Sequence, residues 1–303
     1  MVEWRNGGKG LTNWSGSCMI FVCLYEVNNT KNPSKKGMET DMSERKQAPE
    51  TPWYLRPFGP LVSLALLCVV WGVYGKARLS GRRTRAQRAW QVVSQGCVYD
   101  LGRDLTRHNC FRYCNRGSLS SAYFAQATAA LSDGYIYLAL THSNSPAGEV
   151  IGLFTGRAYN HISLAFDRAL KTLVSYNGGE GGEAPGLNPE TLKGLAERKG
   201  ASVRVYRLAA TRHQKQIMLK RLRKINQEGS AYNLLGLLFP MSCQPNIMFC
   251  SQFVYAMLRL AGLHYFRKNP LQVRPTDFVE WDRRGRLAFV AEFACTARIA
   301  SPR

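Results

Sequence analysis

Acidic residues are scarce in this sequence, and several common motifs are missing from it. Only 20 of the 303 residues are Asp or Glu, against 41 Lys and Arg, which gives a net charge of +21 at pH 7. The nine cysteines lie at irregular spacings, which does not indicate a disulfide framework. The nucleotide-binding pattern G-x-x-x-x-G-K-[ST] does not occur, and the glycine-rich stretch 178–186 has neither the lysine nor the helix that phosphate binding needs. With 45% hydrophobic residues the chain is not wholly disordered, and its charge is typical of proteins that bind nucleic acid or an anionic membrane surface.

An uncharged apolar run, FGPLVSLALLCVVWGVYG, occupies residues 58–75. A helix of this length spans about 27 Å, which is just enough for the hydrocarbon core of a bilayer. Prolines near its start suit the first turn of a helix, and tryptophans and tyrosines lie near both ends, as interfacial aromatics do. We therefore predict a transmembrane helix over 58–75. The alternative is a buried core helix of a soluble domain.

Positive charge is concentrated directly after this run. Six basic residues with no acid among them follow it: Lys76, Arg78, Arg82, Arg83, Arg85 and Arg88. Because an excess of Lys and Arg marks the cytoplasmic end of a membrane span, we expect the C-terminal side to be cytoplasmic and to contact anionic lipid. The sequence thus divides into a polar, largely disordered segment (1–57), the transmembrane helix (58–75), a basic juxtamembrane and helical linker (76–131) and a folded domain (132–303). Met42 is an alternative start.

Two candidate binding features have simpler interpretations. His108, Cys110 and Cys114 could contribute to a zinc site, but a structural site needs four ligands and no second pair follows. We favour ordinary reduced cysteines and expect no metal or cofactor. An acid-free stretch of basic residues between Arg204 and Lys224 predicts a solvated helix face, and because no nucleic-acid motif accompanies it, nucleic acid is not an expected partner.

A histidine lies at the start of one of the predicted strands. Apolar residues alternate with His161, Ser163 and Ala165, and a second strand follows after a short turn. If the two strands pair as a hairpin, Ser175 and Asn177 lie on the same face as His161. The segments predicted as strands are Tyr135–Thr141, His161–Phe166, Thr172–Asn177 and Val203–Leu208.

A cysteine stands at the start of a predicted amphipathic helix. Phe253, Met257 and Leu260 repeat at helical spacing, and Gly262 can end the helix. Cys250 comes just before this stripe, where the unpaired N–H groups and the positive end of the helix dipole favour the thiolate form. A cysteine nucleophile also needs a base within reach, which a histidine on a neighbouring strand could supply. A further helix is predicted over Thr211–Glu228.

These motifs resemble those of a known family. The stretches YNHISLAFDRALKTLVSYN (159–177) and FCSQFVYAMLRLAGL (249–263) are similar to the circularly permuted papain-fold cysteine hydrolases of the NlpC superfamily, in particular the YiiX-like branch. The segments AYNLLGLLFP (231–240) and RPTDFVEW (274–281) also look like that branch, so the resemblance covers about half of the chain. It implies an α+β fold, a permuted papain-like (NlpC-type) domain with an antiparallel sheet and packed helices.

The resemblance also implies roles for individual residues. His161 would be the general base, Cys250 the nucleophile and Ser175 the residue that orients the imidazole, with Asn177 as the alternative for the third position. The residues around Ser175 depart from the family pattern, and Gln252 stands where the family often has an acid.

The predicted function is therefore that of a membrane-anchored cysteine hydrolase. Its substrate would be an amide, as in a peptide, or an ester or thioester of a lipid, since a related branch acts on lipids. A lipid acyltransferase or phospholipase-like enzyme of the same fold, or a non-catalytic adaptor that binds anionic membrane through its basic surface, are the alternatives. A large separation between Cys250 and His161 would favour the adaptor, because a base must lie near its nucleophile.

Overall fold

A computed structural model describes residues 58–81, 83–94, 112–143, 159–179, 183–197, 200–234, 236, 242 and 244–294. The predicted disordered segment 1–57 lies outside these residues, as do His108 and Cys110 of the possible zinc site and half of the motif at 231–240.

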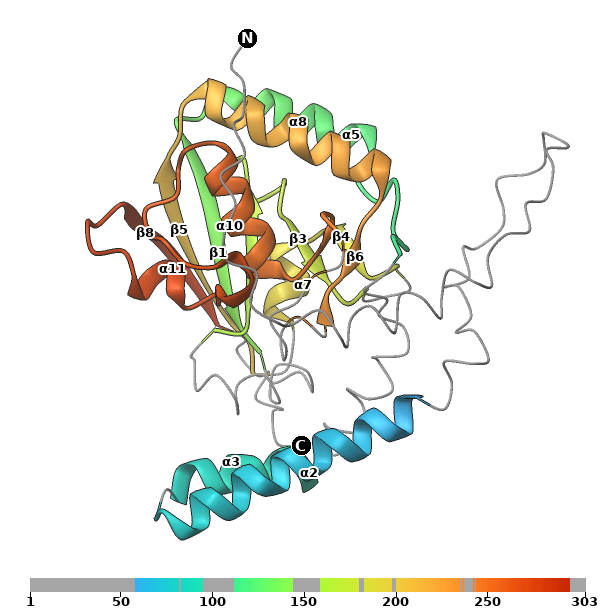
Figure 1. Cartoon of the computed structure of the whole chain (residues 1–303). Helices are drawn as coiled ribbons and strands as arrows, with labels where there is room; N and C mark the ends of the chain where they lie inside the picture. Colours follow the sequence, from blue (N-terminus) through green and yellow to red (C-terminus); the bar gives the residue numbers. More distant parts are fainter. Residues whose placement is uncertain are drawn as a thin grey trace, which may run out of the picture. The chain divides into compact units, whose positions relative to one another are not determined.

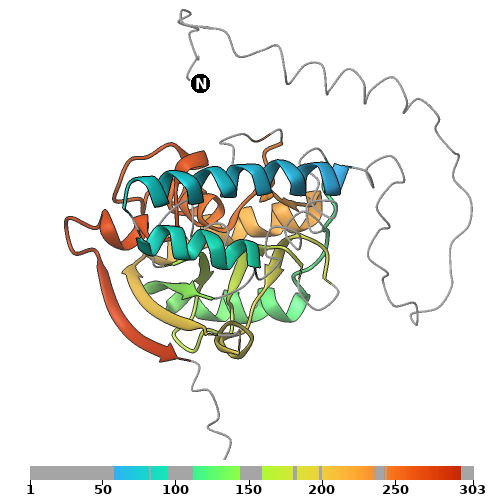
Figure 2. The same ribbon diagram turned by 90° about the horizontal axis from the view of Figure 1, so that it is seen from below.

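The first described part of the chain is a pair of helices. Helix α2 (Phe58–Leu79) and helix α3 (Arg83–Ser94) are joined by a turn in which Gly81 has a φ of 69°, a conformation that favours glycine. They run side by side in Figure 2. Trp71 packs edge-on against Tyr74 at 5.4 Å and against Trp90 of α3 at 6.0 Å between ring centroids.

The helix predicted at 58–75 is thus present, but its prediction as a transmembrane helix is not supported. Helix α2 continues past Gly75 through Lys76 and Arg78, both charged. Within the described ranges, no helix combines the length and the apolar character needed to cross a membrane.

A six-stranded antiparallel sheet forms the frame of the domain, and helices pack against it, as predicted for an α+β fold (Figure 1). The strand order is β4-β3-β2-β1-β5-β8. The strands are β1 (Tyr135–His142), β2 (His161–Ala165), β3 (Val174–Asn177), β4 (Gly186–Pro189), β5 (Ser202–Ala209) and β8 (Leu287–Ala294). A separate parallel pair consists of β6 (Ala231–Tyr232) and β7 (Ile247–Met248).

The four predicted strands are confirmed as β1, β2, β3 and β5, with ends shifted by one or two residues. In β2 every residue is buried, including the polar His161 and Ser163, although its alternating pattern is typical of a strand with one exposed face. Leu164 pairs with Val174 across β2 and β3. Counting along the antiparallel pair from there places Asn177 opposite His161.

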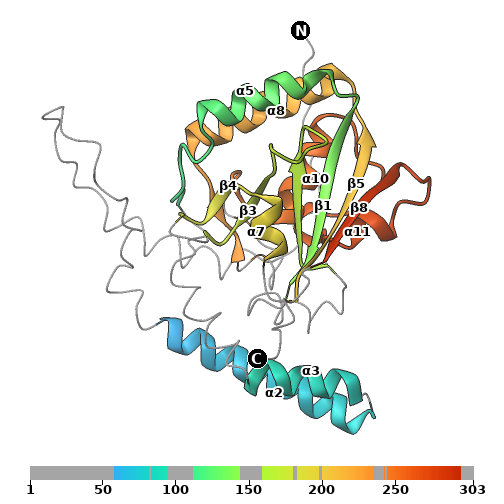
Figure 3. The same ribbon diagram turned by 180° about the vertical axis from the view of Figure 1, so that it is seen from behind.

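Helices cover both faces of the sheet. On one face the core joins Ile162 and Leu164 to the apolar sides of α5 (Ser121–Ala129), α8 (Arg212–Glu228) and α10 (Cys250–Leu260). On the other face Leu195 of α7 (Leu192–Ala196) packs with Ala165 and Leu173, and Figure 3 shows α7 on the side away from α10. The remaining short helices are the 3-10 turns Ala130–Ser132 and Pro270–Gln272 and helix α11 (Asp277–Glu280).

The domain core begins earlier in the chain than residue 132. Leu119, Tyr123 and Ala127 are buried in the same cluster as the strands, and Asn115 forms a β-bridge with Ser230. Residues from 115 onward therefore contribute to the folded domain.

Helix α8 confirms the predicted helix and corrects one feature of its surface. Thr211 caps it in a capping box with Gln214. The acid-free stretch was expected to be a solvated basic face, but Lys215 is fully buried. Its Nζ lies within hydrogen-bond distance of four backbone carbonyls, which share its three N–H donors: Ala130 at 2.6 Å, Asp133 at 2.7 Å, and Tyr135 and Phe166 at 2.8 Å.

Candidate active site

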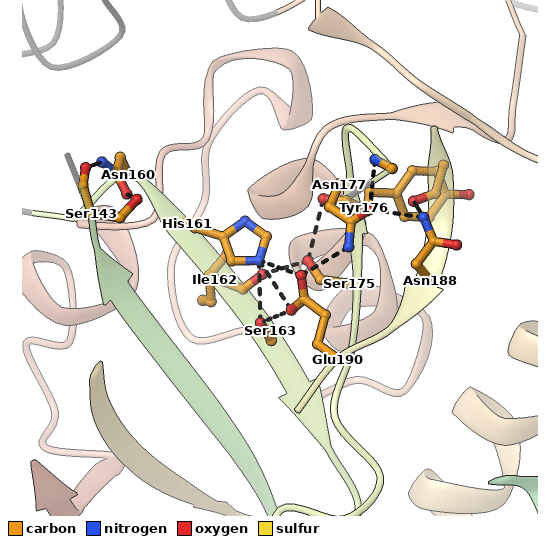
Figure 4. A network of polar contacts seen from close by, with 12 residues as sticks. Ser143, Asn160, His161, Ile162, Ser163, Ser175, Tyr176, Asn177, Asn188 and Glu190 are labelled. Atoms are coloured by element: carbon orange, nitrogen blue, oxygen red, sulfur yellow. Dashed lines mark hydrogen bonds and ion pairs between the residues drawn. The ribbon is translucent and has the colours of Figure 1, made fainter. Parts of the chain in front are cut away.

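His161 is held by a carboxylate. It is the first residue of β2, and its Nε2 lies 3.0 and 3.1 Å from the two carboxylate oxygens of Glu190, just beyond the end of β4 (Figure 4). Both side chains are almost fully buried, with 10% and 5% of their surfaces exposed. A buried carboxylate at this distance fixes the orientation of an imidazole and favours its protonated form.

Polar neighbours hold Glu190 in place from two strands. The Ser163 hydroxyl donates to its Oε2 at 2.5 Å, and the Asn177 amide donates to its Oε1 at 3.0 Å. Burial alone would raise the pKa of Glu190, but the charge of His161 and these hydrogen bonds lower it to about 2. Glu190 is therefore ionised at any physiological pH.

A chain of amides supports this carboxylate from behind. Asn188 donates to Asn177 Oδ1 at 2.8 Å, and Asn115 donates to Asn188 Oδ1, also at 2.8 Å. Asn115 further donates to the carbonyls of Ala184 and Leu187. Because the amides of Asn177 and Asn188 both donate and accept, the chain fixes the direction of the Asn177 N–H without adding charge.

Cys250 lies near His161. It is the first residue of α10 and is 2% exposed, and its charge influences the pKa of His161. Figure 4 shows that the second ring nitrogen, Nδ1, points away from Glu190, so it is the nitrogen available to the thiol. The start of α10 is anchored beside it, because Ser251 Oγ donates to the carbonyl of Val273 at 2.7 Å.

The charges around His161 decide where the proton resides. Burial alone would lower the pKa of His161, but the negative charge of Glu190, then that of Cys250, and hydrogen bonds to both outweigh it and raise the pKa to about 10. At neutral pH the imidazole is therefore protonated. A histidine this close to a cysteine is the kind of acid and base that a cysteine nucleophile needs.

The structure brings together two of the three predicted site residues. His161 and Cys250 meet as expected, but Ser175 does not reach the imidazole. Its hydroxyl donates to the backbone carbonyl of Ile162 at 2.7 Å, although it lies on the predicted face of β3. Asn177, the alternative for the third position, lies opposite His161 and acts on it through Glu190.

The residue in the third position, Glu190, was missed by the sequence analysis. It follows β4, whose sequence Gly-Leu-Asn-Pro has no apolar alternation and contains a proline, so no strand was predicted there. Ser163 was placed correctly on the His161 face but given no role. Ser163 lies two residues after His161 and on the same face of the strand, and this spacing is the sequence signal that could have indicated its role.

The described residues include no group of three or more His, Cys, Asp or Glu side chains arranged to hold a metal ion. Cys114, the one described member of the possible zinc site, directs its thiol to the carbonyl of Pro185 at 3.2 Å. Burial is the main influence on this thiol and raises its pKa above the ordinary value, so it is the less reactive kind of cysteine.

No family model, curated protein or solved structure matches this chain. The chemistry of the site therefore has to be argued from its own geometry.

Proposed function

We propose that this chain is a cysteine hydrolase that cleaves an amide, ester or thioester bond with Cys250 as nucleophile and His161 as its acid and base. One observation carries the proposal: a cysteine at the start of a buried helix interacts with a histidine whose Nε2 is held by a buried carboxylate. This is the arrangement of nucleophile, base and orienting group that covalent catalysis requires. The order of the two motifs, histidine strand before cysteine helix, supports membership of the permuted papain-fold hydrolases.

The first chemical step forms an acyl-enzyme. The Cys250 thiolate attacks the substrate carbonyl and forms a carbon–sulfur bond. The backbone N–H of Cys250, at the first turn of α10 where N–H groups have no intrahelical acceptor, is the candidate donor to the developing oxyanion. His161 then gives its proton to the leaving amine or alcohol as the bond to it breaks.

Water completes the reaction with His161 as base. In the acyl-enzyme the sulfur carries no charge, so one of the two negative charges that raise the pKa of His161 is gone. The imidazole becomes easier to deprotonate at the step where it must accept a proton from water. Attack by the resulting hydroxide breaks the carbon–sulfur bond, releases the acid and restores the ion pair.

The proposal is tested by replacing the nucleophile. Cys250→Ala should abolish hydrolysis of amide and thioester probes and remove the fastest site of iodoacetamide labelling, measured peptide by peptide by mass spectrometry. Cys114→Ala is the matched control, because it removes a partly buried thiol outside the site and should leave both rates unchanged. If fast labelling survives in Cys250→Ala, or if Cys250 in the unchanged protein reacts no faster than exposed Cys68, the proposal is wrong.

A further inference from the structure

Large hydrophobic side chains are exposed on the hairpin that α2 and α3 form. The described part of the chain exposes nine such residues, and five of them belong to this hairpin: Leu64, Val69, Trp71, Leu79 and Trp90. Trp71 is 43% exposed and Trp90 is 53% exposed. A single exposed hydrophobic residue needs no explanation, but a group of them on two short helices indicates an interaction surface.

On α2 the exposed apolar side chains share one face. Leu64, Trp71 and Leu79 follow one another at seven and eight residues, which is about two helical turns each time, and exposed Cys68 lies between the first two. We call these four residues the apolar stripe. The other side of the hairpin is accounted for, because its helices bury a different set of side chains: Val70, Ala77, Ala86, Ala89 and Val92.

The apolar stripe continues into an aromatic patch formed by Trp71, Tyr74 and Trp90. The ring centroids of Trp71 and Trp90 are 6.0 Å apart, and those of Tyr74 and Trp90 are 6.2 Å apart, so the patch joins the two helices. Tryptophan and tyrosine are enriched where a membrane meets water, because each combines an apolar ring with a polar N–H or O–H group.

Positive charge adjoins the aromatic patch. Residues 58–94 contain six Lys and Arg and no Asp or Glu, and Lys76, Arg78 and Arg83 are exposed. The Arg78 guanidinium lies over the ring of Tyr74, 5.9 Å from its centroid. A second copy of the hairpin would bring like charges together. An anionic lipid surface instead offers phosphates to the bases and an apolar layer to the stripe, so charge complementarity favours lipid as the partner.

We propose that the α2–α3 hairpin binds along the surface of an anionic lipid bilayer. Trp71 and Trp90 occupy the boundary between headgroups and acyl chains, and the exposed bases contact the phosphates. Both helices lie in the plane of the interface in this arrangement, as basic amphipathic segments do, which differs from the membrane crossing predicted from the sequence. The inference uses no residue of the candidate active site, so it is tested separately from the proposed function.

Cosedimentation of the full chain with lipid vesicles tests the role of the bases. The chain should bind vesicles of phosphatidylcholine and phosphatidylglycerol more tightly than vesicles of phosphatidylcholine alone. The triple variant Lys76→Gln, Arg78→Gln, Arg83→Gln should bind the anionic vesicles about 100-fold more weakly, because each base near such a surface contributes about fivefold.

Exposed bases of α8 provide the matched control. The control variant has the same loss of charge outside the hairpin, at three exposed positions: Arg212→Gln, Lys220→Gln and Lys224→Gln. It should weaken binding less than about threefold, because attraction to a charged surface falls off within a Debye length. Equal weakening in the two triple variants would show that only the net charge matters and would overturn the inference.

Quenching of tryptophan fluorescence by brominated lipid tests the position of the aromatic patch. Trp71→Phe combined with Trp90→Phe keeps the ring packing and should bind vesicles within about threefold of the unchanged protein, but most of the quenching should be lost. Trp281→Phe changes an exposed tryptophan of the folded domain and should keep the quenching. Quenching that persists in the double variant contradicts insertion of the patch.

Other partners predict different results. Retention of the chain on DNA without binding to anionic vesicles would assign the bases to nucleic acid. A concentration-dependent dimer that is lost in Trp71→Ala, without vesicle binding, would assign the apolar stripe to a second copy of the chain. Either result overturns the inference and leaves the proposed function of Cys250 unaffected.

Discussion

The strand β2 has a buried charge near each of its ends, and the two charges are held in different ways. At its start, His161 contacts Glu190 and Cys250, whose side chains can gain or lose a proton. Just beyond its end, the carbonyl of Phe166 accepts from Lys215 Nζ, and the other partners of this ammonium are also backbone carbonyls. Carbonyls stabilise a charge but cannot exchange a proton with it. The comparison therefore separates the proposed site of chemistry from a site that only contributes stability, although both bury a cation beside the same strand.

The largest effect is expected from removing the structural charge. Lys215→Met should lower the free energy of unfolding by about 3–5 kcal/mol, because four carbonyls lose their donor in a buried site. Urea unfolding measures this loss, with exposed Lys220→Met as the control. The Cys250 alkylation rate of the folded protein should stay within about twofold. A variant as stable as the unchanged protein would show that Lys215 has no such role.

Removing the carboxylate that holds His161, at the start of β2, should mainly lower the reactivity of Cys250. Glu190→Gln keeps the shape of the side chain but removes the charge that raises the pKa of His161, so the thiolate loses its imidazolium partner at neutral pH. We expect alkylation and hydrolysis at pH 7 to slow by about 100-fold, within the range of acid–base catalysis. Exposed Glu197→Gln serves as the control. Equal rates in Glu190→Gln and the unchanged protein would contradict the role given to Glu190.

The ion pair between His161 and Glu190 should also make the free energy of unfolding depend on pH. The lowered pKa of Glu190, about 2, adds stability that is present above about pH 4.5 and is lost as the pH falls toward 2. The raised pKa of His161, about 10, adds stability that is present below about pH 6.5 and is lost as the pH rises toward 10. The difference in unfolding free energy between the unchanged protein and Glu190→Gln should therefore be largest, about 2 kcal/mol, between pH 4.5 and 6.5. A difference that does not vary with pH would exclude the ion pair as its source.

The smallest effects are expected from replacing Ser163 and Ser175, two serines on the same face of the sheet. Ser163→Ala removes a hydrogen bond to the Glu190 carboxylate and should slow Cys250 alkylation by about tenfold. Ser175→Ala removes a hydrogen bond to a backbone carbonyl, so it should cost about 1 kcal/mol of stability and change the rate less than about twofold. The opposite ranking of the two rates would restore Ser175 as the orienting residue.

The sequence allowed prediction of the elements with strong local patterns, and it singled out His161 and Cys250, which the structure places close together. Alternation placed β2 and the shared face of His161 and Ser175, and helical spacing placed the start of α10 at Cys250. Parity along a strand determines the face of a side chain but not where its hydroxyl points, which is why Ser175 was assigned to the imidazole. Glu190 could not be found because it is 29 residues from His161 and follows a strand without a periodic pattern.

Lys215 could have been recognised as buried from its sequence position. It precedes Met218, Leu222 and Ile225 at three, seven and ten residues, which places it on the buried stripe of α8. The high positive charge of the chain led instead to the prediction that the basic residues of this helix are exposed to solvent. A lysine on an apolar stripe is a signal for an internal partner, here four carbonyls that no sequence pattern identifies.

The position of Cys250 couples its reactivity to the state of the whole domain. Phe253, Val254 and Met257 of the same helix are part of the main core, so α10 meets His161 only when that core is complete. If Cys250 is the nucleophile that we propose, its reactivity therefore depends on complete folding of the domain. Its alkylation rate then measures the fraction of molecules that are correctly folded.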